Sequence, residues 1–191
     1  MPHTALINKI LFLLKKIAFF ILITICLSST GDYTNEYYKK SELIEKFVKF
    51  IEWPSKARMY VKTEPFIITI IGENPFEETL KNYFSTRKIY DKMILIRYIN
   101  EVEEINGSHI LFIAKSKRKQ LPDILKYTYN KPILTIGETK HYSERGVLIN
   151  FYIEDKEVRF EINETAAKNS GLYINFHLLS AARIINPVKK S

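Results

Sequence analysis

Three short runs of consecutive apolar residues occupy the middle of the chain, at Phe66–Ile71, Ile110–Ala114 and Ile133–Ile136. Continuous apolar runs of this length are typical of strands buried on both faces of a sheet. Amphipathic stretches of helix length separate them, at about 76–83 and 119–127, and residues 93–98 add a further strand. This alternation of strand and helix predicts a mostly parallel sheet with helices on both sides.

The first predicted element is an amphipathic helix over about Asn35–Glu52. Its apolar residues follow the i, i+3, i+4, i+7 spacing of one helix face, and Pro54 stops it because proline lacks an amide donor. The stripe consists of Ile44, Phe47, Val48 and Ile51.

The last third of the chain changes character. Residues 147–153 are mostly apolar, residues 158–162 alternate between apolar and charged, and the charged turn 154–157 joins the two segments. This pattern predicts an antiparallel hairpin near the sheet edge. Asn163 can cap a following helix, and a terminal helix is expected over Asn175–Ile185. The predicted fold class is α/β: a single-domain three-layer sandwich with a mostly parallel central sheet, a C-terminal antiparallel hairpin and closing helices.

The N-terminus has the layout of a secretory signal peptide. Lysines precede the run Ile17–Leu27, whose eleven residues fit a signal core but not a membrane span, which needs about twenty. We expect cleavage near residues 28–31, so that residues 1–31 are the signal and 32–191 one exported domain. An uncleaved anchor is the alternative, and lipidation at Cys26 is disfavoured by the large Ile25 before it.

Composition narrows the classes of function. The 29 basic and 21 acidic residues give +8, and removing three signal lysines leaves about +5, a mild excess that favours an anionic partner without identifying one. Nucleic acid is not expected outside the cytoplasm.

The single cysteine lies in the signal, so no disulfide forms in the mature chain. The four histidines lack ligand spacing, and no nucleophile motif is visible, so we expect no metal, no cofactor and no catalytic residues.

The ends of the buried strands are the candidate ligand crevice. In open α/β sheets ligands gather where strands end and helices begin. The residues concerned are Gly72, Glu73, Asn74, Lys115 and Gly137. The alternative is that these glycines only permit tight turns, since no phosphate-binding glycine motif is present. Likewise the basic run 115–119 is either a solvated surface or a docking site for an anionic partner.

Aromatic residues near the end of the first helix form the candidate docking site for a protein partner. Phe50 and Trp53 lie off the apolar stripe that contains Phe47. They either cover another part of the core or stand at a surface where a partner binds, and burial is the commoner fate of large aromatics. We therefore name Phe47, Phe50 and Trp53 as partner-binding candidates.

The order of landmarks along the chain resembles the YfiR/HmsC-like family of bacterial periplasmic regulators. The landmarks are Phe-x-x-Phe-x-x-Trp-Pro, Ile-Gly-Glu-Asn-Pro-Phe, His-Ile-Leu-Phe-Ile-Ala, Pro-Ile-Leu-Thr-Ile-Gly, Gly-Val-Leu-Ile-Asn-Phe, Arg-Phe-Glu-Ile-Asn and Leu-Leu-Ser-Ala-Ala-Arg, and they extend from about Glu42 to Ile185. The chain departs from the family's usual pattern at Arg145-Gly146 and Asn175-Phe176.

The resemblance implies a periplasmic protein that inhibits a membrane signalling enzyme such as a diguanylate cyclase, and thereby affects cyclic-di-GMP signalling and biofilm formation. The implied partners are the extracytoplasmic domain of that enzyme and an outer-membrane protein that competes for the regulator. A homodimer is compatible with the family. The alternative is a periplasmic small-molecule sensor that feeds a histidine kinase or a transporter.

Overall fold

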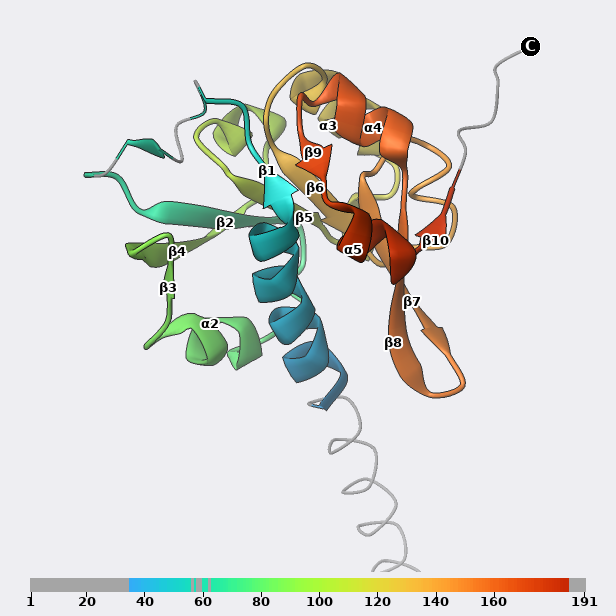
Figure 1. Cartoon of the computed structure of the whole chain (residues 1–191), viewed down its shortest axis with the longest axis horizontal. Coiled ribbons are helices and arrows are strands. Elements are labelled where there is room, and N and C mark those ends of the chain that lie inside the picture. Colours follow the sequence, from blue (N-terminus) through green and yellow to red (C-terminus); the bar gives the residue numbers. More distant parts are fainter. Residues whose placement is uncertain (1–34, 56, 58–59, 62, 186–191) are drawn as a thin grey trace, which may run out of the picture. The chain divides into compact units, whose positions relative to one another are not determined.

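The computed structural model describes residues 35–185 apart from 56, 58, 59 and 62, so the predicted signal peptide and Cys26 lie outside the described residues. A helix whose described part covers residues 35–50, called the N-terminal helix below, comes first (Figure 1). The described residues from Tyr37 onward belong to one compact unit. The later elements are β1 (Ile51–Glu52), β2 (Phe66–Ile71), α2 (Thr79–Phe84), β3 (Lys88–Ile89), β4 (Lys92–Ile99), η2 (Val102–Ile105), β5 (Ile110–Ile113), η3 (Lys115–Lys117), α3 (Leu121–Thr128), β6 (Leu134–Gly137), β7 (Ile149–Glu154), β8 (Glu157–Ile162), α4 (Glu164–Asn169), β9 (Tyr173–Ile174), α5 (Phe176–Ser180) and β10 (Arg183–Ile184).

In the described part, the main sheet has eight strands in the order β10-β8-β7-β6-β5-β2-β4-β3. Five neighbouring strands, β4, β2, β5, β6 and β7, are parallel to one another. The strands β7 and β8 form the expected antiparallel hairpin. The hairpin turns at Asp155 and Lys156, both at positive φ, which matches the right-handed twist of the strands it joins. The prediction of a mostly parallel sheet with a C-terminal hairpin is confirmed.

A hydrophobic core lies on each face of this sheet. The N-terminal helix and α2 cover the face from which Phe66, Ile68 and Ile70 of β2 project. On the other face Ile71 packs with residues of α3 and η2. The two cores make the predicted α/β sandwich, because the continuous apolar strands need cover on both faces. None of the helices in the described residues is both long and apolar enough to cross a bilayer.

The N-terminal helix ends earlier than the sequence suggested. It stops at residue 50, and Ile51–Glu52 is the strand β1, which pairs antiparallel with Ile174 and Tyr173 of β9. Pro54 still forbids helix at this point, but pairing with β9 satisfies the backbone groups before it. The sequence pattern could not reveal a partner strand about 120 residues away.

The predicted terminal helix over Asn175–Ile185 is also wrong in length. Asn175 caps α5, its side chain accepting from the amide of His177, but this helix is only five residues long. Beyond it, Arg183–Ile184 pairs in parallel with Glu161–Ile162 of β8 as the strand β10. The open edge of β8 offers backbone hydrogen bonds that a longer helix would leave unused.

Candidate functional site

A group of exposed aromatic side chains lies where the end of the N-terminal helix meets β9 and α5. Tyr173 is 64% exposed, Phe176 73% and Phe50 37%. The ring of His177 lies between two of them, with its centroid 6.5 Å from that of Phe50 and 6.1 Å from that of Phe176. We call Phe50, Tyr173, Phe176 and His177 the aromatic surface.

Backbone pairing holds the aromatic surface in place. The amide of Asn175 donates to the carbonyl of Phe50 at 2.9 Å, so α5 starts beside the end of the N-terminal helix (Figure 1). The buried pair Ile51 and Ile174 anchors the small β1–β9 sheet, and Tyr173 in the same sheet points outward. These aromatics are therefore exposed on a fixed backbone, and burial of their large rings against a partner would remove apolar area from water.

The three predicted partner-binding residues differ in their exposure to solvent. Phe47 is fully buried, with its ring 4.9 Å from Phe160 and 5.7 Å from Phe151. Trp53 is 4% exposed, and its indole N–H donates to the carbonyl of Pro132. Both are core residues and offer no exposed ring for docking. Phe50 alone of the three reaches the surface.

Sequence reasoning missed Tyr173 and Phe176. The expected helix over Asn175–Ile185 gave Phe176 no distinct face, and a two-residue strand at Tyr173 is too short to show a period. In the structure Leu172 and Ile174 are buried on either side of the exposed Tyr173, but the sequence Leu-Tyr-Ile is apolar throughout and carried no signal of this alternation.

The predicted crevice lies at the place where the winding of the sheet reverses. From β2 the chain goes to β4 on one side, then returns to β5 on the other, and ligands of open α/β sheets bind outside such a reversal. Gly72 and Glu73 follow β2 and Lys115 follows β5, so the structure brings these three predicted residues to one place.

The chain's own side chains fill part of this reversal point. The hydroxyl of Ser116 accepts a 2.9 Å hydrogen bond from the amide of Glu73. A Cβ atom on Gly72 would lie 2.6 Å from the Ser116 hydroxyl oxygen and 2.8 Å from Cγ of Lys117. Gly72 is thus needed for close packing between the two strand ends. A ligand role for these residues stays a prediction.

The basic run splits into packed and solvated members. Lys117 donates from Nζ to the carbonyl of Asn100 at 2.6 Å, and Ser116 bonds to Glu73. Lys115, Arg118 and Lys119 are exposed, and none of them has a carboxylate within 4 Å among the described ion pairs. Of the four basic side chains, only Lys117 is therefore tied to the fold, and the other three face solvent.

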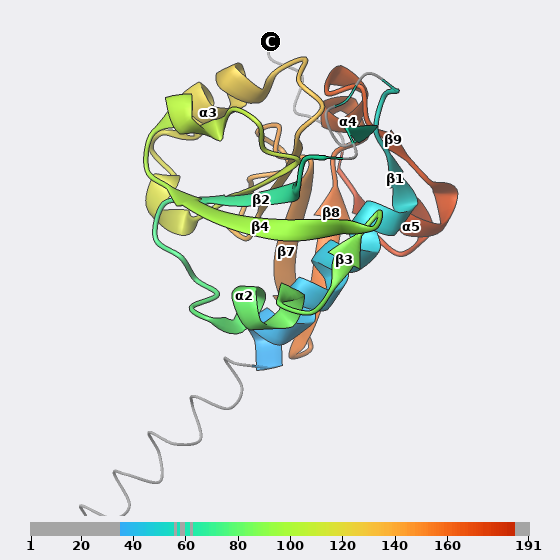
Figure 2. The ribbon, with the colours of Figure 1, turned by 90° about the vertical axis from the view of Figure 1, so that its left-hand side faces the viewer.

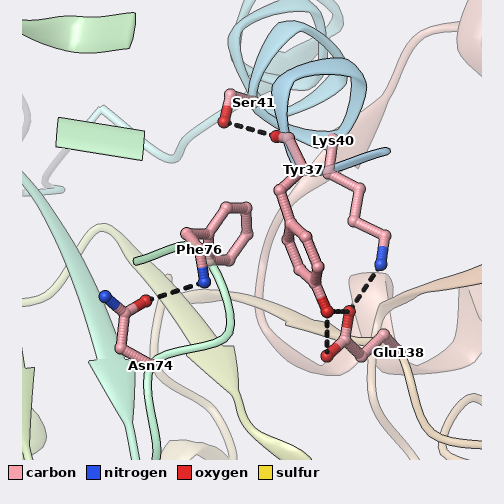
Figure 3. A network of polar contacts seen from close by, with 6 residues as sticks. All are labelled: Tyr37, Lys40, Ser41, Asn74, Phe76 and Glu138. Atoms are coloured by element: carbon pink, nitrogen blue, oxygen red, sulfur yellow. Dashed lines mark hydrogen bonds and ion pairs between the residues drawn. The ribbon is translucent and has the colours of Figure 1, made fainter. Parts of the chain in front are cut away.

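A polar network lies at the end of β6, on the face covered by the N-terminal helix (Figure 3). Lys40 Nζ lies 2.6 Å from a carboxylate oxygen of Glu138, and Tyr37 donates its hydroxyl to the same carboxylate at 3.2 Å. The ring of Tyr37 packs edge-on against Phe76, whose amide donates to the side-chain oxygen of Asn74. The network ties the helix to the ends of β2 and β6, and it engages the polar groups of Asn74 and Glu138 within the fold.

Gly137, the last predicted crevice residue, serves packing on the opposite face. A Cβ atom there would lie 2.6 Å from the ring of Tyr142 and 3.0 Å from the side-chain oxygen of Asn150. Burial raises the pKa of the Tyr142 phenol, which therefore stays neutral at ordinary pH.

The described histidines are separate from one another. His109 is buried, stacks on Phe66 at 4.8 Å and accepts from the amide of Ile67, so it is a packed core histidine. His141 pairs with Glu144 in a loop. Within the part of the chain that the structure describes, no three residues of the His, Cys, Asp and Glu types are grouped so as to hold a metal ion.

Comparison with known proteins identifies a family and a fold. A family model described as YfiR/HmsC-like matches residues 37–183. A crystal structure of a conserved domain protein from Vibrio cholerae O1 biovar El Tor is similar in fold, with a TM-score of 0.51 and 11% sequence identity over 78% of this chain. The match covers 59% of that protein's chain. No curated protein matches the sequence.

Proposed function

Because the chain belongs to the YfiR/HmsC-like family, we propose that it is a periplasmic regulator that binds the extracytoplasmic domain of a membrane signalling enzyme. The family is a regulatory, non-catalytic one, which supports a regulatory role in general. The enzyme proposed is a diguanylate cyclase, held inactive by the bound regulator, so that cyclic-di-GMP and biofilm formation fall.

The observation that carries this proposal is the aromatic surface. Rings as exposed as those of Phe176 and Tyr173 are unfavourable in water, and aromatic residues supply much of the binding energy at protein interfaces. His177 and Phe50 extend the same surface. A regulator needs a surface of this kind, whereas an enzyme needs a convergent set of reactive groups.

The mechanism requires only unequal binding to two states of the receptor. If the regulator binds the inactive conformation of the cyclase more tightly than the active one, it shifts the population toward the inactive state. An outer-membrane protein that binds the same surface would compete for the regulator and release the cyclase. The strength of inhibition is then set by the difference in affinity between the two states.

Cellular cyclic-di-GMP tests the proposal. Deleting the gene should raise cyclic-di-GMP, and the wild-type chain should restore the low level. A chain with Tyr173→Ala and Phe176→Ala should fail to restore it, since each lost ring weakens binding by roughly tenfold. Tyr129→Ala is the matched control, because Tyr129 is 60% exposed and lies outside the aromatic surface.

Two results would count against the proposal. Unchanged cyclic-di-GMP in the deletion strain would remove the cyclase as the regulated enzyme. Full restoration by the double variant, at equal protein level, would remove the aromatic surface from the interface.

A further inference from the structure

The chain contains two sequons for the attachment of a glycan to asparagine. A sequon is Asn-x-Ser or Asn-x-Thr in an exported chain, with any residue but proline in the middle. Asn106 begins one, at residues 106–108, and Asn163 begins the other, at residues 163–165. Both follow Glu-Ile, so the full segments are Glu-Ile-Asn-Gly-Ser and Glu-Ile-Asn-Glu-Thr. Bacterial oligosaccharyltransferases select an acidic residue at that place, where a cationic side chain of the enzyme pairs with it.

Asn106 is exposed on a turn whose backbone is held in place. The strand β4 crosses the front of Figure 2 with β3 beside one end, and η2 follows its other end. Asn106 comes directly after η2 and is exposed to solvent. Its carbonyl accepts from the guanidinium of Arg97 at 3.0 Å, and Gly107 continues the turn at a φ of +80°. A sugar on the Asn106 side chain would therefore extend into solvent without moving the backbone.

Asn163 has the same acceptor sequence but the opposite environment. It is 1% exposed, and its side-chain oxygen accepts from the amide of Ala166 at 2.8 Å as the cap of α4. Its side-chain nitrogen, the atom that would carry the sugar, donates to the carbonyl of Ser143 at 2.7 Å. A glycan is far larger than the space beside a buried amide, so a chain modified at Asn163 cannot adopt this fold.

We propose that Asn106 is an N-glycosylation site and that folding excludes Asn163. The donor is an oligosaccharide carried on a lipid pyrophosphate, and the catalyst is a membrane oligosaccharyltransferase. The side-chain nitrogen of Asn106 bonds to the anomeric carbon of the sugar, and the bond from that carbon to the pyrophosphate oxygen breaks. The lipid pyrophosphate leaves with the electron pair, and the nitrogen gives up one proton, so nothing is oxidised or reduced. The inference rests on the proposed export of the chain and not on the enzyme that it regulates.

The contacts of the first sequon place the transfer before folding is complete. Ser108, the third residue of the sequon, is 6% exposed. Its hydroxyl donates to the carbonyl of Ile105 at 2.6 Å and accepts from Arg97 at 2.9 Å. The carboxylate of Glu104 accepts from two backbone amides just before η2. Both groups that the enzyme must contact are thus engaged in the folded chain, whereas an exported chain that has not yet folded presents them freely.

Co-expression with a bacterial oligosaccharyltransferase and its lipid-linked oligosaccharide tests the site. The full-length chain carries a second copy of residues 104–108 appended to its C-terminus, which reports whether this sequence is modified when no fold restrains it. Mass spectrometry of glycopeptides from the soluble periplasmic protein should find the glycan on Asn106 and on the appended copy, and none on Asn163.

Two variants and a second substrate complete the test. Asn106→Gln should lose the glycan at that position and keep the one on the appended copy. Thr165→Ala removes the second sequon at an exposed position and should leave the Asn106 glycan unchanged. Folded protein from cells without the enzyme, mixed afterwards with enzyme and donor, should be modified on the appended copy much faster than on Asn106.

Several results would overturn the proposal. A glycan on the appended copy but not on Asn106 would remove the site, and a glycan on Asn163 in soluble protein would show that folding does not exclude it. Equal rates at Asn106 and the appended copy in folded protein would contradict transfer before folding. If neither is modified in cells that glycosylate another exported protein, the chain is not exported, and the proposed periplasmic location fails together with the site.

Discussion

At the level of single residues, Gly72 shows how close packing fixes a residue type. Its φ of +97° lies in a region that side chains disfavour, and the Ser116 hydroxyl and the Lys117 stem fill the space where a Cβ would go. Gly146 also has a positive φ, +117°, but a Cβ atom there would have Leu125 Cδ1 as its nearest neighbour at 3.5 Å, an ordinary contact. A side chain at Gly146 would meet backbone strain alone, whereas a side chain at Gly72 would meet both backbone strain and crowding by its neighbours.

We predict that Gly72→Ala destabilises the fold more than Gly146→Ala. The Gly146 variant should lose about 1–3 kcal/mol from backbone strain alone. The Gly72 variant should lose a further 1–3 kcal/mol, roughly, because its methyl group overpacks the contact with Ser116. Urea denaturation of both variants measures the difference. Equal losses would mean that Ser116 and Lys117 move aside freely, and that the end of β2 is less tightly packed than the structure indicates.

At the level of elements, Glu45 joins the N-terminal helix to α2. The Tyr83 hydroxyl donates to its carboxylate at 2.6 Å, and Lys49 and Arg87 lie within 4 Å of it. The Tyr83 hydrogen bond, followed by the two cations, lowers the pKa of Glu45 below 4.5 against an opposing effect of burial. Burial and the Glu45 charge in turn raise the pKa of Tyr83. The ionised carboxylate is therefore the form that the folded state favours.

The stability that this carboxylate adds should depend on pH in one direction. Because its pKa is lower in the folded chain, the contribution is complete above the unfolded pKa and is lost as pH falls through the folded value. Wild type should be more stable than Glu45→Gln at pH 7, and this gap should shrink below about pH 4.5. Urea denaturation of both chains, repeated at steps of about one pH unit between roughly pH 2 and 7, measures this difference in stability at each pH. Tyr83→Phe should reduce the pH-dependent part, and a gap that stays constant with pH would contradict the assignment.

At the level of the whole molecule, the sequence predicted the elements with strong periods and missed those that depend on distant partners. The buried strands such as Phe66–Ile71 and the hairpin at Asp155 were correct, because burial on two faces and alternation leave a local pattern. The pairing of β1 with β9 and the exposure of Phe176 leave none, since each is decided by residues far along the chain. For the same reason, the sequence could place Gly72 and Lys115 at strand ends but could not show that Ser116 bridges them.

The ion pair of Lys40 and Glu138 also joins residues that are far apart in the sequence, and its contribution to the free energy of unfolding can be measured. The two residues are 98 positions apart, their side chains are 4% and 14% exposed, and their charged atoms lie 2.6 Å apart. Removing the Lys40 charge should cost about 3–5 kcal/mol, because it leaves the mostly buried Glu138 carboxylate without that counter-charge. Lys40→Met and Glu138→Gln together should then cost less than the sum of the two single changes.

A double-mutant cycle by urea denaturation gives the coupling, which we expect to be about 1–3 kcal/mol. The exposed pair Lys39 and Glu42, 3.0 Å apart on the same helix, should couple by less than about 1 kcal/mol, because water screens it. If the Lys40 and Glu138 changes add without coupling, the pair is not what ties the N-terminal helix to β6. The hydrogen bond from Tyr37 to Glu138 and the packing of Tyr37 on Phe76 would then be the contacts that fix the helix over the sheet.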